Sequence, residues 1–225
     1  MPAPSARAGL GRSATAGPRT LPVMRLLCAL LAAVALGWQL SIHIAMGFSV
    51  ANFFSYFTNL SNLFAAAVLV FGALSAGRGA SNLYDRFRAV SVVNMTVVGL
   101  VFAVLLRNAD LGALLPWVNI VLHYVMPCAI ILEWLLAPPT SRFGTRQLLL
   151  VLVFPTLYLI YTLIRGRILG WYPYPFLNPG SVGVSGVAVH AVGIAVTFIV
   201  AGWILLAAAN KLGVAAAAVR NAGVS

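Results

Sequence analysis

The sequence predicts an all-α membrane protein, a polytopic bundle of six transmembrane helices with both termini in the cytoplasm. Three observations support this fold class. The chain of 225 residues is 62% hydrophobic and only 8% charged, with a mean hydropathy of +1.00. Six apolar runs reach or approach the ~20 residues that a spanning helix needs. The basic residues lie mostly between and beyond these runs, which is typical of membrane topology and not of nucleic-acid binding.

The apolar runs divide the chain into one transmembrane domain, 23–210, and two tails. The first run exceeds the ~15-residue core of a signal peptide, so we interpret it as a retained helix. The tail 1–22 is predicted to be disordered and basic, because it is built from Ala, Gly, Pro, Ser, Thr and Arg without apolar periodicity. The tail 211–225 is short and Ala-rich, and either extends the last helix or frays. The six runs are 26–47, 54–77, 88–107, 117–137, 147–165 and 187–208.

Orientation follows from the distribution of the 14 Lys and Arg residues. Six spans place eleven of them on the side that holds both tails, and three on the other side: Arg107, Arg165 and Arg167. Because cytoplasmic loops carry the excess of positive charge, both termini are predicted to be cytoplasmic. The expected location is a cell membrane, the bacterial inner or plasma membrane.

The second run opens with a polar stripe that lipid does not favour. On a helix, Asn52, Ser55, Thr58, Asn59 and Asn62 share one face at spacings of three and four residues. Amides and hydroxyls that faced hydrocarbon would lose hydrogen bonds that nothing replaces. The stripe is therefore predicted to face other helices, and it is the first candidate for a functional site.

Depth along the helices groups other polar residues with this stripe. Thr58 is predicted ~8 Å and His123 ~9 Å from the outer ends of their helices, at 1.5 Å per residue. Asn119 lies one turn before His123, and Tyr161 and His190 also map to the outer half. These positions predict a polar pocket open to the outer leaflet. The loop 170–180, with its aromatic residues and three prolines, is either an interfacial aromatic belt or a lid.

Several of these residues resemble a known family. The string Tyr56-Phe-Thr-Asn-Leu-Ser-Asn62, Asn119-x-x-x-His123 and Trp171-Tyr-Pro-Tyr-Pro-Phe176 are similar to segments of the Pr6Pr family of bacterial membrane proteins. That family in turn is distantly similar to the androgen-induced/FAR-17a-type membrane proteins, which hydrolyse fatty-acid esters of hydroxy fatty acids with a threonine nucleophile and a histidine. The resemblance covers about residues 25–208 and implies that Thr58 is the nucleophile and His123 its partner.

The chemistry of these residue types agrees with an ester hydrolase. A threonine hydroxyl needs a base to take its proton, and a neutral histidine is the usual one. The amides of Asn59, Asn62 or Asn119 could stabilise an oxyanion, and Asn119 could instead orient His123. Glu133 lies ~15 Å along the helix from His123, so we expect a dyad without a carboxylate.

Other classes of function are less well supported by the sequence. No Gly-rich phosphate loop is present, and neither cysteine has a second ligand at zinc spacing, so we expect no cofactor, no metal and no nucleic-acid partner. The expected partners are the bilayer and a lipid or fatty-acyl ester. A small membrane transporter and a non-catalytic lipid-binding protein remain the alternatives, and the sequence leaves the oligomeric state open.

Overall fold

In the computed structural model, residues 20–76, 81–108 and 113–222 are described, and they form helices and connecting segments with no strand among them. The elements are α1 (Thr20–Ala45), α2 (Val50–Phe53), α3 (Phe57–Leu74), α4 (Asn82–Val101), π-helical η1 (Phe102–Leu106), α5 (Pro116–Ile120), π-helical η2 (Val121–Val125), α6 (Met126–Leu136), α7 (Thr145–Leu169), 3-10 helix η3 (Pro175–Leu177) and α8 (Pro179–Ala222).

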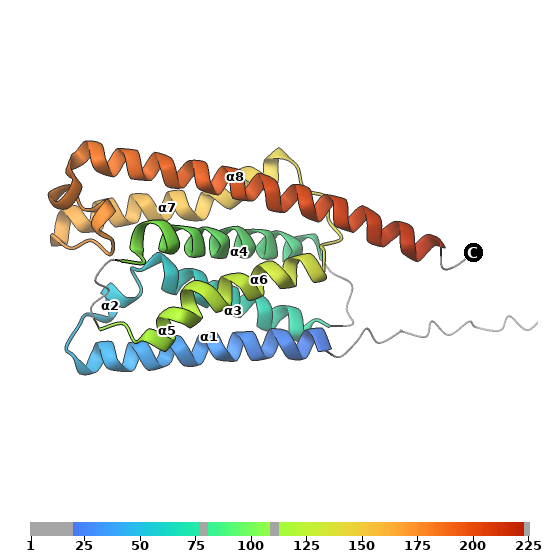
Figure 1. Cartoon of the computed structure of the whole chain (residues 1–225), viewed down its shortest axis with the longest axis horizontal. Helices are drawn as coiled ribbons and strands as arrows, with labels where there is room; N and C mark the ends of the chain where they lie inside the picture. Colours follow the sequence, from blue (N-terminus) through green and yellow to red (C-terminus); the bar gives the residue numbers. More distant parts are fainter. Residues whose placement is uncertain (1–19, 77–80, 109–112, 223–225) are drawn as a thin grey trace, which may run out of the picture.

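The predicted all-α fold with six membrane-length helices is confirmed. α4 and η1 form one span, and α5, η2 and α6 form another, so the described residues contain six helices long and apolar enough to cross a bilayer. α1 begins and α8 ends at the same end of the bundle (Figure 1). The side of the membrane on which that end lies remains a prediction, as does the basic tail, most of which lies outside the described residues. α8 starts before its predicted position and kinks at Gly183, whose positive φ of 71° suits glycine.

The bundle is organised around α4. It packs against α3, α6, α7 and α8, while α1 packs along α3 (Figure 1). The buried side chains of α1 include Ala29, Ala32 and Ala35, small residues at helical spacing that allow close approach of a neighbouring helix. α7 leaves most of its side chains exposed, as expected for a helix that faces lipid.

A buried ionic cluster closes the end of the bundle at which α1 begins. Arg25 of α1 and Arg88 of α4 both bond to Glu133 of α6, at 2.5 and 2.9 Å. All three side chains are nearly inaccessible to solvent. Asp85 accepts hydrogen bonds from the loop after α6, at Thr140.

This cluster corrects one inference from the sequence. The charge count includes Arg25 and Arg88 among the eleven basic residues on the side of both tails, and Glu133 was considered only as a distant neighbour of His123. Instead these residues join three helices inside the bundle, because a carboxylate at membrane depth is stable only when it is paired.

Candidate functional site

The polar stripe does not lie on a single helix, which corrects the predicted run 54–77. α2 ends at Phe53, the chain bends, and α3 begins at Phe57. The bend is held by one tertiary and one local hydrogen bond. Tyr158 of α7 donates to the Ser55 carbonyl at 2.9 Å, and the Ser55 hydroxyl donates to the Ala51 carbonyl, four residues earlier, at 2.6 Å. In a continuous helix the Ser55 and Ala51 carbonyls would accept from backbone N–H groups. Here the hydroxyls of Tyr158 and Ser55 donate to these carbonyls instead.

The bend places Thr58 in the first turn of α3. The N-cap of this helix is Tyr56, so Thr58 is its second residue and its backbone N–H has no partner within the helix. The positive end of the helix dipole therefore lies at the threonine. As predicted, the stripe faces inward: Thr58, Asn59 and Asn62 are at most 8% exposed.

His123 lies on a π-helical turn, η2, between α5 and α6. Pro127 follows it by four residues and has no N–H to donate to the His123 carbonyl, which favours a widened turn at this point. Gly99 of α4 faces the same turn, and a side chain there would meet Pro127 at 3.3 Å. The Phe102 ring stacks on the imidazole with centroids 4.1 Å apart. Proline, glycine and aromatic stacking together fix the position of the ring.

Thr58 Oγ1 lies 3.3 Å from His123 Nε2, and both residues are only 7% exposed. The other ring nitrogen, Nδ1, lies 3.2 Å from the backbone carbonyl of Asn119. A carbonyl only accepts hydrogen bonds, so Nδ1 carries the proton. In the neutral ring Nε2 then holds a lone pair, and the Thr58 hydroxyl donates to it.

Charge around the ring agrees with a neutral imidazole. Among the residues that the structure describes, the salt bridges are confined to the Arg25–Glu133–Arg88–Asp85 cluster, and no carboxylate pairs with His123. The dyad therefore has no acidic third member within the described part of the chain. The orienting group is a backbone carbonyl of the same helix.

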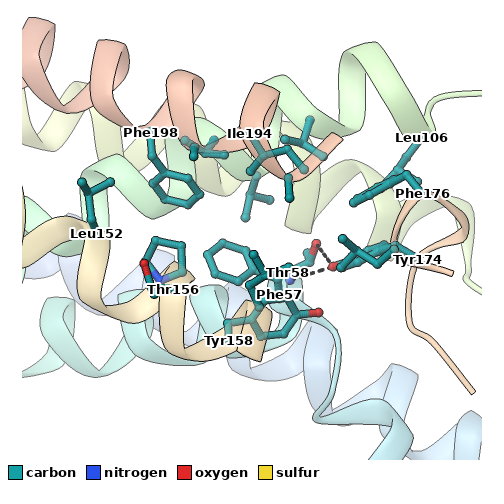
Figure 2. Close-up of a pocket in the computed structure, with 18 residues that line it drawn as sticks. Phe57, Thr58, Leu106, Leu152, Thr156, Tyr158, Tyr174, Phe176, Ile194 and Phe198 are labelled. Carbon is teal, nitrogen blue, oxygen red and sulfur yellow. Dashed lines mark hydrogen bonds between the residues drawn. The ribbon is translucent and has the colours of Figure 1, made fainter. Parts of the chain in front are cut away.

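Tyr174 is a third polar group at the site, and the sequence did not single it out. Its hydroxyl oxygen lies 3.3 Å from the Thr58 backbone nitrogen, which donates to it, and 3.5 Å from Thr58 Oγ1 (Figure 2). Burial raises the pKa of Tyr174 to about 12, so the phenol keeps its proton at neutral pH. The hydroxyl can therefore accept from the backbone while its own proton points to the threonine oxygen.

Tyr174 belongs to the loop for which the sequence left two readings open. In the structure Tyr174, Phe176 and Leu177 are buried, and Trp171 contacts Tyr56 with ring centroids 5.8 Å apart. This loop packs over the first turn of α3 and covers the site. The sequence signal was its high content of aromatic residues and prolines, which makes a stiff apolar cover.

Two of the three asparagines that we considered as oxyanion donors use their amide nitrogens on backbone carbonyls. Asn59 Nδ2 donates to the Phe53 carbonyl at 2.8 Å, which ties α3 to the end of α2. Asn62 Nδ2 donates to the carbonyls of Thr58 and Leu122, at 2.9 and 3.2 Å, which ties α3 to η2. The Asn119 side-chain oxygen has no partner, and this residue contacts His123 through its backbone. The amides of Asn59 and Asn62 therefore position the dyad.

The two remaining predicted residues lie outside the immediate site. The Tyr161 hydroxyl pairs with Ser55 Oγ at 2.8 Å, and its side chain is 44% exposed. His190 bonds to the Gly186 carbonyl at 2.7 Å and stacks on Phe176, with centroids 5.8 Å apart. Neither residue lines the chamber around the dyad. Tyr161 supports the bend before α3, and His190 supports the covering loop.

Two cavities meet at Thr58. The polar chamber contains the dyad together with Asn59, Tyr174 and Gln39. The apolar cavity lies on the other side of Thr58, among α4, α7 and α8, and Figure 2 shows Phe57, Thr58 and Tyr174 at its wall. Thr58 and Tyr174 are common to both, so the threonine hydroxyl lies where a polar and an apolar space adjoin.

Comparisons with known proteins do not identify a function for this chain. A scan against models of protein families, a search of curated proteins and a search of solved structures each found no match. The chain is a multi-pass helical membrane protein by its fold, and its activity has to be argued from the site.

Proposed function

We propose that this protein is an integral membrane hydrolase of fatty-acyl esters, with Thr58 as nucleophile and His123 as general base. The observation that carries the proposal is the 3.3 Å approach of Thr58 Oγ1 to His123 Nε2 at the junction of the two cavities. The resemblance to the Pr6Pr family points in the same direction. The cell membrane is the expected location, with the site in its outer leaflet.

In the acylation step, the Thr58 hydroxyl gives its proton to His123 Nε2 while Oγ1 bonds to the ester carbonyl carbon. The carbonyl oxygen of the resulting tetrahedral intermediate carries the negative charge. The intermediate collapses by breaking the bond to the alkoxy oxygen, which takes the proton from Nε2 and leaves as the alcohol. Nδ1 keeps its proton throughout, because it donates to the Asn119 carbonyl.

Two features can stabilise the oxyanion. The Tyr174 hydroxyl lies beside Thr58 Oγ1 and remains protonated at neutral pH. The N-terminus of α3 adds the positive end of an 18-residue helix. Such preorganised donors are commonly worth ~10²-fold or more each in kcat.

Deacylation uses the same residues in reverse. Water from the polar chamber gives a proton to His123 Nε2 and attacks the acyl-threonine carbonyl. The bond to Oγ1 then breaks, the proton returns to Oγ1, and a fatty acid is released. The polar chamber therefore serves water and the alcohol, and neither step needs a group beyond this chain and its substrate.

Hydrolysis of a fluorogenic octanoyl ester by the purified protein in detergent tests this proposal. Thr58→Val keeps the shape of the side chain and lacks the nucleophile, whereas Thr58→Ser keeps the hydroxyl. We expect Thr58→Val and His123→Gln each to lose at least ~10³-fold in kcat, as for other nucleophile–base pairs, and Thr58→Ser to retain measurable turnover. A folded Thr58→Val protein with wild-type turnover would refute the mechanism and favour a non-catalytic lipid-binding protein or a transporter.

A further inference from the structure

The apolar cavity beside Thr58 extends into the bundle, away from the covering loop. Counting the open space at its edge, the empty volume is about 800 Å³. Its wall is almost wholly apolar, with Thr58, Thr156 and two tyrosines as the exceptions. A cavity of this composition excludes a polar or charged ligand and favours a hydrocarbon chain.

The cavity is elongated along the bundle. Its end near the dyad is formed by Tyr174 and Phe176, and its far end by Leu152 and Phe198 (Figure 2). Tyr158 and Leu152 both line it from α7, and their separation of six positions corresponds to ~9 Å along the helix. The length and the apolar wall suit an extended chain whose functional group lies at Thr58.

Part of the cavity wall reaches the outer surface of the bundle. Thr156 of α7 and Ala195 of α8 line the cavity and are also exposed on the outside of the bundle. Around them these two helices carry exposed aliphatic side chains, such as Leu157 and Val192 at 61% and 64%. A chain can therefore pass from the bilayer into the cavity between α7 and α8 without crossing water.

We propose that this cavity binds the acyl chain of the ester, which enters from the bilayer between α7 and α8, and that Leu152 and Phe198 at its far end limit the chain length. The inference rests on the proposed function and names a part of its substrate. The ester carbonyl then lies at Thr58, and the alcohol part of the substrate occupies the polar chamber with His123.

The preference for acyl-chain length tests whether Leu152 forms the far end of the cavity, when this side chain is made larger or smaller. Leu152→Trp fills the far end and Leu152→Ala extends it, and the ratio of kcat/KM for palmitoyl over octanoyl esters is measured for each. We expect Leu152→Trp to lower this ratio by about tenfold or more and Leu152→Ala to raise it, because each methylene in such a pocket matters severalfold. Equal changes for both esters, or no change, would overturn the assignment.

The matched controls are Leu149→Trp and Leu149→Ala. Leu149 lies one turn earlier on α7, is 60% exposed and does not line the cavity. These variants should leave the ratio within about twofold of the wild type, since they change only the lipid-facing surface. A shift as large as that of the Leu152 variants would show that the ratio reports the membrane-facing side of α7, and would overturn the assignment.

Photocrosslinking separates failure of the cavity from failure of the hydrolase. Palmitic acid with a diazirine near its methyl end is added to the Thr58→Val protein, which cannot turn over an ester, and adducts are mapped by mass spectrometry. We expect adducts at Leu152 or Phe198 that excess palmitate removes. Such adducts, together with a wild-type protein that hydrolyses no ester, would uphold the cavity and refute the hydrolase. Hydrolysis by the wild type together with adducts only at lipid-facing residues would refute the cavity alone.

Discussion

Replacing Tyr174 by phenylalanine removes one oxygen atom from the site and leaves its packing in place. The hydroxyl contacts the Thr58 backbone nitrogen at 3.3 Å and Thr58 Oγ1 at 3.5 Å. The ring stacks on Phe176, with centroids 5.1 Å apart and planes within 4°, and it contacts the Tyr56 ring edge-on. These apolar contacts do not need the hydroxyl, so the loop stays over the site in the variant.

The expected effect on kcat is a loss of about 10²-fold, the usual consequence of removing one oxyanion donor. KM should change little, because the hydroxyl acts on charge that develops only in the transition state. The loss in stability at neutral pH should be ~1 kcal/mol, as for one hydrogen bond. An effect on kcat much larger than the effect on stability therefore distinguishes a chemical role from a structural one.

The same substitution changes the response of stability to alkaline pH. Burial raises the pKa of Tyr174 from 10.0 to about 12. Below pH 10 both the folded and the unfolded chain hold the proton, and the contribution of this group to stability is fully present. Between pH 10 and 12 this phenol ionises in the unfolded chain before it ionises in the folded protein. The free energy of unfolding therefore falls by up to about 3 kcal/mol as the pH rises through the folded pKa. Tyr174→Phe should remove this part of the alkaline loss.

The assay combines hydrolysis of an octanoyl ester with thermal unfolding in detergent from pH 7 to 12. Tyr172→Phe is the matched control, because its ring packs on Gly166 of α7 and its hydroxyl pairs with none of the described residues. It should keep wild-type kcat and the wild-type alkaline profile. If Tyr174→Phe also keeps wild-type kcat, or loses activity only in proportion to folded protein, Tyr174 is not an oxyanion donor.

Three further predictions concern the groups that hold the site and the bundle. Glu133→Gln leaves the buried Arg25 guanidinium without a carboxylate and leaves Arg88 with Asp85 alone, so it should lower the free energy of unfolding by ~3–5 kcal/mol. An unchanged melting temperature would show that the cluster is not stabilising. Gly72→Ala places a Cβ onto the Tyr84 hydroxyl and should cost ~1–3 kcal/mol, while Gly193→Ala, with open space around it, should be neutral or stabilising; equal effects would contradict the packing of α3 on α4. Asn62→Ala removes the hydrogen bonds to the Thr58 and Leu122 carbonyls, the second of which joins α3 to η2. It should lower kcat more than Thr58→Ser does, when the two variants are compared at the same concentration of folded protein.

The fold could be predicted from the sequence because its main determinant is local. Runs of about 20 apolar residues specify spanning helices whatever their neighbours are. The bend before α3 could not be predicted in this way, because residues 53–57 are mostly aromatic and their composition does not distinguish them from the rest of the apolar run. The bend depends on a hydrogen bond to the Ser55 carbonyl from Tyr158, which is more than 100 residues away in the chain.

The sequence was sufficient to identify the two central residues of the candidate site, but not the residues that surround them. Polar side chains at membrane depth are costly, so Thr58 and His123 stood out against their apolar neighbours. Tyr174 did not, because a tyrosine in a loop is ordinary at a membrane interface and only tertiary packing places its hydroxyl at Thr58. A carboxylate within an apolar run requires a cation nearby, but the sequence did not indicate that Arg25 and Arg88 are the cations that pair with Glu133.

The proposed hydrolysis depends on activation of the Thr58 hydroxyl by His123. Its most direct test is mass spectrometry of the purified protein after reaction with an alkyl fluorophosphonate, a probe that modifies activated serine and threonine hydroxyls. We expect a covalent adduct on Thr58 in the wild type, and no adduct at this position in the folded His123→Gln and Thr58→Val proteins. An unmodified Thr58 in the wild type, or an adduct on Thr58 that persists in His123→Gln, would show that Thr58 is not a nucleophile activated by His123.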